Sequence, residues 1–148
     1  MSVDIHHTGN IPGSSPRRSA FVNLEKVIFG FFIIFACTLN FGFFIGDLER
    51  AELHHPMELL AAVVVNLIAT VLKFGDRTHL GTTHLATSLV ASLQLLAASL
   101  VWVWRLYVTQ LPLDGEVTAA IVSLSGGALL ANLFSVILLL GETLRQGR

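Results

Sequence analysis

The sequence predicts an all-α protein, an integral membrane bundle of four transmembrane helices. Four long apolar runs fill most of the 148 residues, and no charged residue lies in the middle of any run. Each run is about long enough to cross a bilayer as a helix. Hydrophobic residues make up 53% of the chain and charged residues 13%, whereas soluble domains carry roughly 25% charged residues. Because lipid offers the backbone no water to bond, each run must satisfy its own N–H and C=O groups by forming a helix.

The chain divides into a short tail and one membrane domain. Residues 1–22 are mostly polar and rich in Ser, Gly and Pro, which predicts a disordered tail. Residues 23–148 are predicted to form the transmembrane domain, whose first span covers about 27–46 and is rich in Phe. The other three spans are expected at about 57–73, 83–104 and 117–141.

Residues at the helix ends support these boundaries. The second span starts after Pro56, which suits a first helical turn, and Glu58 lies where the helix dipole favours an acid. Thr82 or Thr83 can cap the third span, and Asp114 can cap the fourth. The starts of the second, third and fourth spans therefore each carry a residue that satisfies or complements the unpaired N–H groups of a first turn.

The basic residues predict the orientation in the membrane. Seven Lys and Arg residues fall on one side of the four spans: Arg17, Arg18, Lys26, Lys73, Arg77, Arg145 and Arg148. Only Arg50 and Arg105 fall on the other side, where Trp102, Trp104 and Tyr107 form an aromatic belt. Because segments rich in Lys and Arg remain on the cytoplasmic side of a membrane, both termini and the 73–82 connection are predicted to be cytoplasmic.

Small residues predict where helices pack against each other. In the fourth span they recur every fourth position, at Ala119, Ser123, Gly127, Ala131 and Ser135. The first span ends in a GxxxG pattern made by Gly42 and Gly46. Such stripes let a neighbouring backbone approach closely in lipid. Together they offer more contact surface than one monomer can use, which predicts a homo-oligomer or a place in a larger membrane complex.

Each span carries one amide side chain: Asn40, Asn66, Gln94 and Asn132. An amide without a partner in hydrocarbon is costly, so each should face protein or water. Two interpretations stay open. The amides bond helix to helix, at roughly 0.5–2 kcal/mol apiece, or they line a narrow permeation path.

The connection between the second and third spans is the most polar one. It contains Lys73, Asp76, Arg77, His79 and His84. The two histidines can respond to cytoplasmic pH, and the helix start beside them can help to bind an anion. The alternative is a solvated turn with ordinary helix caps.

Several functions find no support in the sequence. A net charge of −1 gives no excess of basic residues that would bind nucleic acid. The single cysteine, Cys37, excludes an internal disulfide and any multi-cysteine metal site. His54 and His55 lack a spaced third ligand, so we expect no bound metal. No span has a histidine in its middle to hold a haem, and no nucleophile has a base and an orienting partner. We therefore expect no cofactor and no enzymatic activity.

Two segments carry a resemblance to known proteins. They are residues 65–78, VNLIATVLKFGDRT, and residues 123–132, SLSGGALLAN. With them, the chain from about Phe21 onward resembles a family of small, uncharacterised bacterial four-helix inner-membrane proteins. The resemblance implies a bacterial inner membrane and implies no activity.

The hypothesis that follows is a small channel or transport-type protein for ions or solutes, with a path lined by Asn66, Gln94 and Asn132. The alternative is a non-catalytic accessory or assembly subunit whose amides only hold helices together. The partners expected in both cases are the lipid bilayer and other membrane subunits, not nucleic acid.

Overall fold

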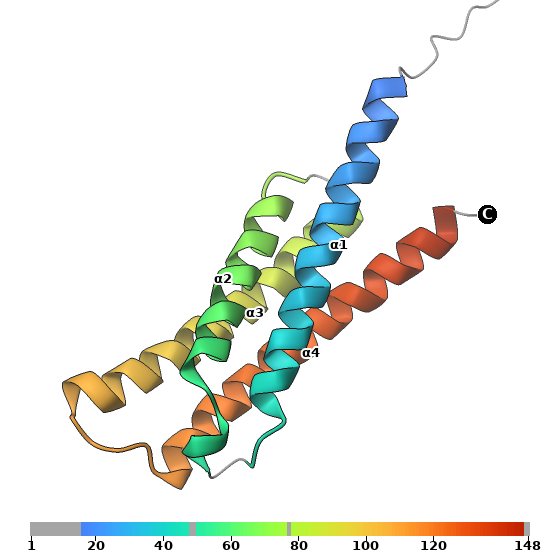
Figure 1. Ribbon diagram of the computed structural model, residues 1–148. Coiled ribbons are helices and arrows are strands. Elements are labelled where there is room, and N and C mark those ends of the chain that lie inside the picture. The colour runs from blue at the N-terminus through green and yellow to red at the C-terminus, as the bar shows by residue number, and fades with distance from the viewer. Residues whose placement is uncertain (1–15, 48–49, 77, 147–148) are drawn as a thin grey trace, which may run out of the picture.

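The computed structural model describes residues 16–47, 50–76 and 78–146, and it confirms the all-α fold. Four long helices are joined by short connections, and these residues contain no strand (Figure 1). The helices are α1 (Pro16–Phe44), α2 (Pro56–Lys73), α3 (His79–Val103) and α4 (Gly115–Gln146). Two shorter elements are a 3₁₀ turn at Ala51–Leu53 and a π-helical turn at Trp104–Val108 that continues α3.

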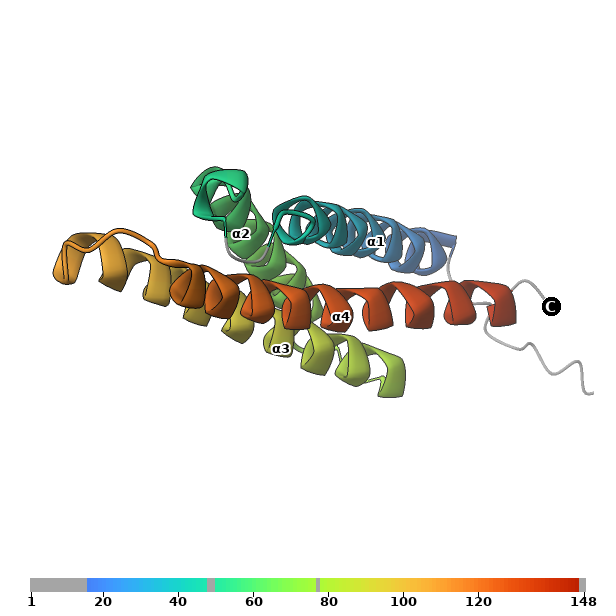
Figure 2. The same cartoon turned by 90° about the horizontal axis from the view of Figure 1, so that it is seen from below.

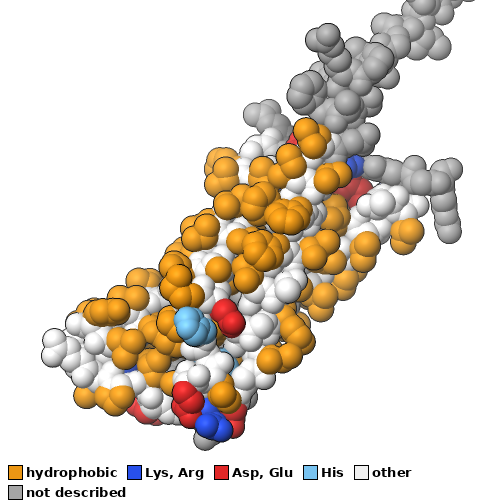
Figure 3. Space-filling view, viewed as in Figure 1, with side chains coloured by type: hydrophobic (Ala, Val, Ile, Leu, Met, Phe, Trp, Pro, Cys, Tyr) orange, Lys and Arg blue, Asp and Glu red, His pale blue; other side chains and the backbone are white. Residues whose placement is uncertain are grey.

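All four helices are long and apolar enough to cross a membrane, with mean hydropathies between 1.7 and 2.2. Their candidate spans are Leu24–Phe44, Pro56–Lys73, His79–Val108 and Gly115–Arg145. On the face drawn in Figure 3, hydrophobic side chains cover the sides of the bundle and charged side chains gather toward its ends. The protein is therefore a multi-pass membrane protein.

The helices pack as a closed ring. α1 contacts α2, α2 contacts α3, α3 contacts α4, and α4 returns to α1. Figure 2 shows α1 and α2 on one side of the pair formed by α3 and α4. The start of α1, the α2–α3 connection and the end of α4 lie toward one end of the bundle, which we call the Lys73 end (Figure 1). The α1–α2 and α3–α4 connections lie toward the other, the His54 end.

The first helix starts earlier than the sequence predicted. α1 begins at Pro16 rather than near Val27, so its first turns occupy part of the segment predicted as a disordered tail. Pro suits this place because the N–H that it lacks has no partner in a first helical turn. Residues 1–15 of the predicted tail lie outside the described residues.

The third helix also starts earlier, at His79. Its N-cap is Thr78, whose Oγ1 accepts a hydrogen bond from the Gly81 amide at 2.9 Å. The expected caps, Thr82 and Thr83, lie one turn inside the helix, where each hydroxyl donates to a carbonyl four residues back. Thr78 takes the cap because Asp76 also bonds it, an interaction that a pattern of helix caps does not include.

Toward the His54 end the largest buried side chains are apolar, and Asn40, Thr118 and Ser125 are buried among them. All four helices contribute buried side chains there, of which the largest are Phe43, Leu59, Leu95, Ile121 and Val122. Five alanines fill the remaining space: Ala62, Ala91, Ala98, Ala128 and Ala131. We call this set the apolar cluster.

The interior becomes polar toward the Lys73 end. Beyond the apolar cluster, the inward-facing positions of α2, α3 and α4 carry Asn66, Thr70, Lys73, His84, Ser88, Ser92, Asn132 and Ser135, all of them buried. Their spacing of three or four residues places them along the inner stripe of each helix. We call this set the polar interior, and a smaller group, Phe29, Ile33 and Ala69, flanks it.

The predicted small-residue contacts form only in part. Ala131 and Ser135 are buried, and Gly127 packs so closely on Gln94 that a Cβ there would lie 2.6 Å from its Nε2 atom. Ser123, in contrast, is exposed. The reason is geometric: a step of four residues advances about 40° around a helix with 3.6 residues per turn, so a long stripe leaves the contact face.

Among the described residues, the two glycines of the GxxxG pattern lie against side chains. Gly42 is exposed, and the nearest heavy atom to a Cβ there is a Glu58 oxygen at 3.8 Å. Gly46 lies beyond Phe44, the last residue of α1, and its space is taken by the His54 ring. Within one chain Gly42 lies near the first turn of α2 and Gly46 leaves room for the His54 ring, while a contact with a second subunit stays a prediction.

Candidate functional site

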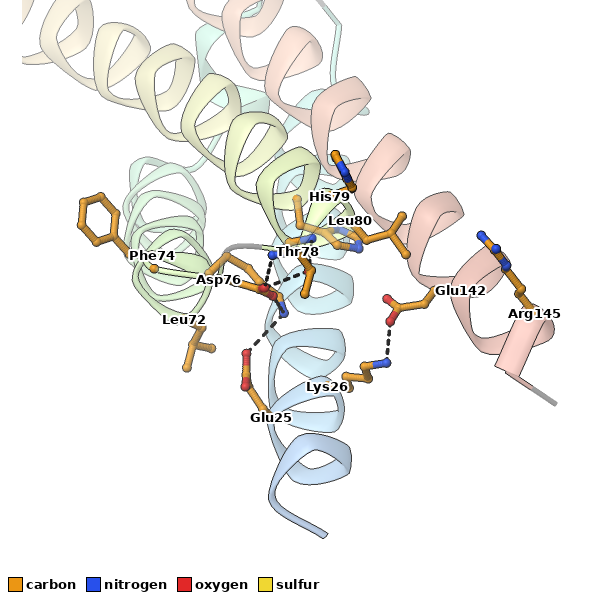
Figure 4. Close-up of a pocket in the computed structure, with 14 residues that line it drawn as sticks. Glu25, Lys26, Leu72, Phe74, Asp76, Thr78, His79, Leu80, Glu142 and Arg145 are labelled. Atoms are coloured by element: carbon orange, nitrogen blue, oxygen red, sulfur yellow. Dashed lines mark hydrogen bonds and ion pairs between the residues drawn. The ribbon is translucent and has the colours of Figure 1, made fainter. Parts of the chain in front are cut away.

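A cavity of about 830 Å³ opens at the Lys73 end of the bundle. Side chains from all four helices and from the α2–α3 connection line it, and Figure 4 shows Glu25, Lys26, Asp76 and Glu142 directed toward its centre. The labelled Phe74 and Arg145 point away from it. We call this cavity the mouth, because it lies where the polar interior reaches the end of the bundle.

Lys73 is the buried cation of the mouth. Its residue is only 5% exposed, although it is the last of α2. Its Nζ donates to Glu25 Oε1 at 3.4 Å and to Asp76 Oδ2 at 3.2 Å, and it lies 4.8 Å from the centroid of the Phe29 ring. Two carboxylates and a ring face thus replace the water that an ammonium group loses on burial.

Asp76 is held from three sides. Its Oδ1 accepts the Thr78 amide at 3.1 Å and the Thr78 hydroxyl at 2.8 Å, while its Oδ2 accepts from Lys73. Partial burial would by itself raise the pKa of Asp76, but the hydrogen bonds from Thr78 and Lys73 outweigh it and lower that pKa below its usual value. The carboxylate occupies the space that a side chain at position 81 would need, which only glycine leaves open.

Ion pairs close the rim of the mouth. Lys26 of α1 donates to Glu142 of α4, and Lys73 of α2 reaches Glu25 of α1 (Figure 4). These pairs join α1 to both of its neighbours in the ring, at the level where the mouth opens. Such partly exposed pairs contribute little stability, with a typical value of about 0–1 kcal/mol. Their significance lies in their position across the opening.

His84 lies at the inner side of the mouth. It is 2% exposed, and its ring packs edge-on against Phe29 with the centroids 4.9 Å apart. Neither ring nitrogen has a hydrogen-bond partner among the described residues. His79, at the start of the same helix, is exposed.

The polar interior continues from His84 into the bundle. Thr70 Oγ1 and Ser92 Oγ lie 3.0 Å apart and join α2 to α3. The Thr87 and Ser135 hydroxyls are hydrogen-bonded and join α3 to α4. Thus some of the polar groups connect helices.

Other buried polar atoms have no partner within the described part of the chain. They are Asn40 Nδ2, Asn66 Oδ1, Ser88 Oγ, Gln94 Oε1 and both side-chain polar atoms of Asn132, besides the His84 ring nitrogens. Asn66 Nδ2 donates to the Ala62 carbonyl at 2.9 Å, and Ser125 Oγ lies 3.4 Å from Asn40 Oδ1. All four predicted amides therefore face the inside of one bundle, where part of their hydrogen-bonding capacity remains open.

At the opposite end, His54 is fully engaged. Its Nδ1 lies 2.7 Å from the Phe43 carbonyl oxygen, and its Nε2 lies 2.9 Å from the Asp47 carbonyl oxygen. These two contacts hold the ring between the last turn of α1 and the α1–α2 connection.

The structure brings together three residues that the sequence marked in the polar connection: Lys73, Asp76 and His84. His79 lines the mouth but is exposed, and Arg77 lies outside the described residues. Sequence reasoning missed Glu25, Phe29 and Glu142. Glu25 and Glu142 each lie beside a long apolar run, which could have marked them as unusual. Nothing in the sequence, however, indicates that α1 and α4 are neighbours.

The comparisons with known proteins give a family and no activity. Residues 53–143 match a family of unknown function, DUF6394. The chain belongs to this family. The match begins in the turn before α2, so it takes in Lys73, His84 and Asn132 but leaves out the Glu25 and Lys26 side of the mouth. No curated protein and no solved structure matches the chain.

Proposed function

We propose that the protein is a transport-type membrane protein that carries small ions or polar solutes through its own four-helix bundle. The unpartnered polar atoms of the interior are the observation that supports it. An unsatisfied buried polar group costs roughly 1–3 kcal/mol, and Asn132 alone presents two such atoms. Water or a passing solute would supply their partners.

The proposed path has an open part and a closed part. It begins at the mouth, follows the polar interior past Ser88 and Asn132, and meets the apolar cluster around Leu95. A hydrophobic constriction can close a path by excluding water, and it opens when helices move or when water enters. The described conformation corresponds to the closed state in this proposal.

This path runs inside one chain rather than along an axis between subunits. The amides face the bundle interior, so a homo-oligomer is a separate prediction that the path does not need. The distribution of basic residues supports an orientation with the Lys73 end in the cytoplasm, and the family resemblance supports a bacterial inner membrane.

The alternative, a non-catalytic accessory subunit, has an observation of its own in its favour. Polar side chains join neighbouring helices at Thr70–Ser92 and Thr87–Ser135, as expected if the polar groups only hold the bundle together. The two proposals differ in what they require of Asn132, which makes no such bond to the described residues.

Asn132→Leu separates the proposals. The full chain is reconstituted in liposomes, and the efflux of small ions and solutes is measured together with thermal unfolding in detergent. A path-lining role predicts lost flux with unchanged or higher stability, because the variant removes unsatisfied polar atoms at similar volume. The control is Leu133→Val on the exposed side of the same helix turn, which should alter neither quantity.

A flux that survives Asn132→Leu would contradict the proposed path. A wild-type protein that passes nothing and is destabilised by Asn132→Leu would favour the accessory role.

A further inference from the structure

His84 has the surroundings of a group that exchanges protons rather than of a packed core histidine. Buried polar groups in proteins are nearly always hydrogen-bonded, yet both ring nitrogens of His84 lack a partner in the described residues. His54 provides the contrast within the same chain, since both of its ring nitrogens contact carbonyl oxygens. His84 also lines the mouth, so one side of its surroundings opens toward solvent.

The chemistry of imidazole fits this position. An ionisable residue inside a membrane span marks a functional site by default. A neutral imidazole has one nitrogen that donates and one that accepts, and its charge changes within the physiological pH range. Because neither nitrogen of His84 is engaged, one can receive a proton while the other releases one.

Charged groups of both signs face His84. Lys73 of α2, Glu142 of α4 and Asp76 of the α2–α3 connection line the same cavity as the ring. From α1, Glu25 and Lys26 line the same cavity. Neither ring nitrogen of His84 forms a hydrogen bond with any described residue, so no hydrogen bond fixes the ring in one charge state.

A row of hydroxyls leads onward from His84. Ser88 lies one helical turn deeper, about 6 Å along the α3 axis, and its buried Oγ has no partner among the described residues. Ser92 follows one turn later and bonds the Thr70 hydroxyl at 3.0 Å. Hydroxyls both donate and accept hydrogen bonds, so with intervening water they can pass a proton along the row.

We propose that the protein conducts protons and that His84 is the group that takes them from the mouth into the polar interior. The proposal rests on the proposed transport function and names its ion. One ring nitrogen accepts a proton from water in the mouth, and the resulting imidazolium releases the proton of the other nitrogen toward Ser88. The first tautomer is restored when the proton on the outer nitrogen is passed through water to the inner nitrogen, so each cycle carries one proton from the mouth inward and leaves the ring unchanged.

The test uses the full chain in liposomes that contain a pH-sensitive dye. A potassium gradient with valinomycin sets the membrane potential, and the rate of internal pH change reports proton flux. His84→Gln should lower this rate at least about tenfold relative to the wild type. His55→Gln is the matched control, because His55 is an exposed histidine that does not line the mouth, and it should leave the rate unchanged.

A second measurement needs no variant. Nitrogen-15 NMR of histidine-labelled wild-type protein follows each ring from about pH 4 to 9, and the His84 resonance should change from the neutral to the charged form within this range. A His84 ring that keeps one charge state over this range would overturn the proposal, and so would His84→Gln with wild-type proton flux.

The flux of other ions distinguishes the proposal of proton conduction from the proposed transport function on which it rests. If the same liposomes pass potassium or small solutes but no protons, the proton proposal falls and the transport function stands. If they pass nothing, both fall.

Discussion

Substitution of Gly81 tests the structure of the mouth most sharply. A Cβ atom at this position would lie 2.0 Å from Asp76 Cγ and 2.2 and 2.4 Å from its two carboxylate oxygens. Real side chains do not approach so closely, so Gly81→Ala must displace the Asp76 carboxylate. The displaced group loses its bonds to Thr78 and Lys73, and Lys73 keeps the weaker contact with Glu25 at 3.4 Å and its place over the Phe29 ring.

The expected cost follows from those contacts. Hydrogen bonds to a charged group contribute about 1.5–3 kcal/mol, and partial exposure of Asp76 reduces the joint loss to roughly 2–4 kcal/mol. Alanine stabilises a helix by about 1 kcal/mol relative to glycine, which offsets part of this loss. We therefore expect a net destabilisation of about 1–3 kcal/mol, or a fall in Tm of about 3–9 °C for a chain of this size.

The assay is thermal unfolding of the purified protein in detergent, followed by circular dichroism. Gly141→Ala is the matched control, since no heavy atom lies within 4 Å of a Cβ there, and its Tm should stay the same or rise. If both alanine variants have the same Tm as the wild type, the Asp76 carboxylate does not occupy the place described here.

Three further predictions concern other parts of the bundle. The lowered pKa of Asp76 means that its charge stabilises the fold above the unfolded-state pKa and that this contribution is lost as the pH falls through the lower folded-state value. The stability of Asp76→Asn should therefore fall short of the wild type at pH 7 and converge on it only as the pH drops through the folded-state pKa, as measured by urea unfolding. Leu95→Asn should raise ion leak through liposomes by admitting water to the apolar cluster, whereas Leu93→Asn on the exposed side of α3 should not, and equal leak in the two variants would contradict a hydrophobic closure. The reversal Lys26→Glu should loosen the mouth, and adding Glu142→Lys should restore the wild-type rate at which the α1 amides near residue 26 exchange hydrogen; a double variant that exchanges as fast as the single one would exclude the ion pair.

Much of the fold could be predicted because the membrane restricts the possible structures. Apolar runs of the observed length can only be helices in lipid, and Pro56 and Lys73 coincide with the two ends of α2. Helix starts outside the membrane were harder to predict. Pro16 and Thr78 begin or cap helices among polar residues, where no change in hydropathy marks the boundary.

The candidate site could be predicted only in its local part. Lys73, Asp76 and His84 lie close together in sequence, so a polar connection pointed to them. Lys26 and Glu142 are far apart in sequence, and they meet only because α4 closes the ring against α1. The burial of His84 was also missed, since starting α3 near Thr83 left that residue at a solvated helix start, whereas the actual start at His79 places it one turn inside.

Accessibility of single cysteines along α3 tests the central claim that a polar interior opens from the mouth and ends at the apolar cluster. In a Cys37→Ser background, cysteine replaces Ser88, Ser92, Leu95 or Leu93, and a small charged thiosulfonate reagent is added to each variant in liposomes. Our account predicts reaction at positions 88 and 92, with little at 95 inside the apolar cluster or at 93 on the exposed, lipid-facing side. Cysteines at 88 and 92 that react no faster than the one at 93 would show that the interior is dry, and would contradict the account.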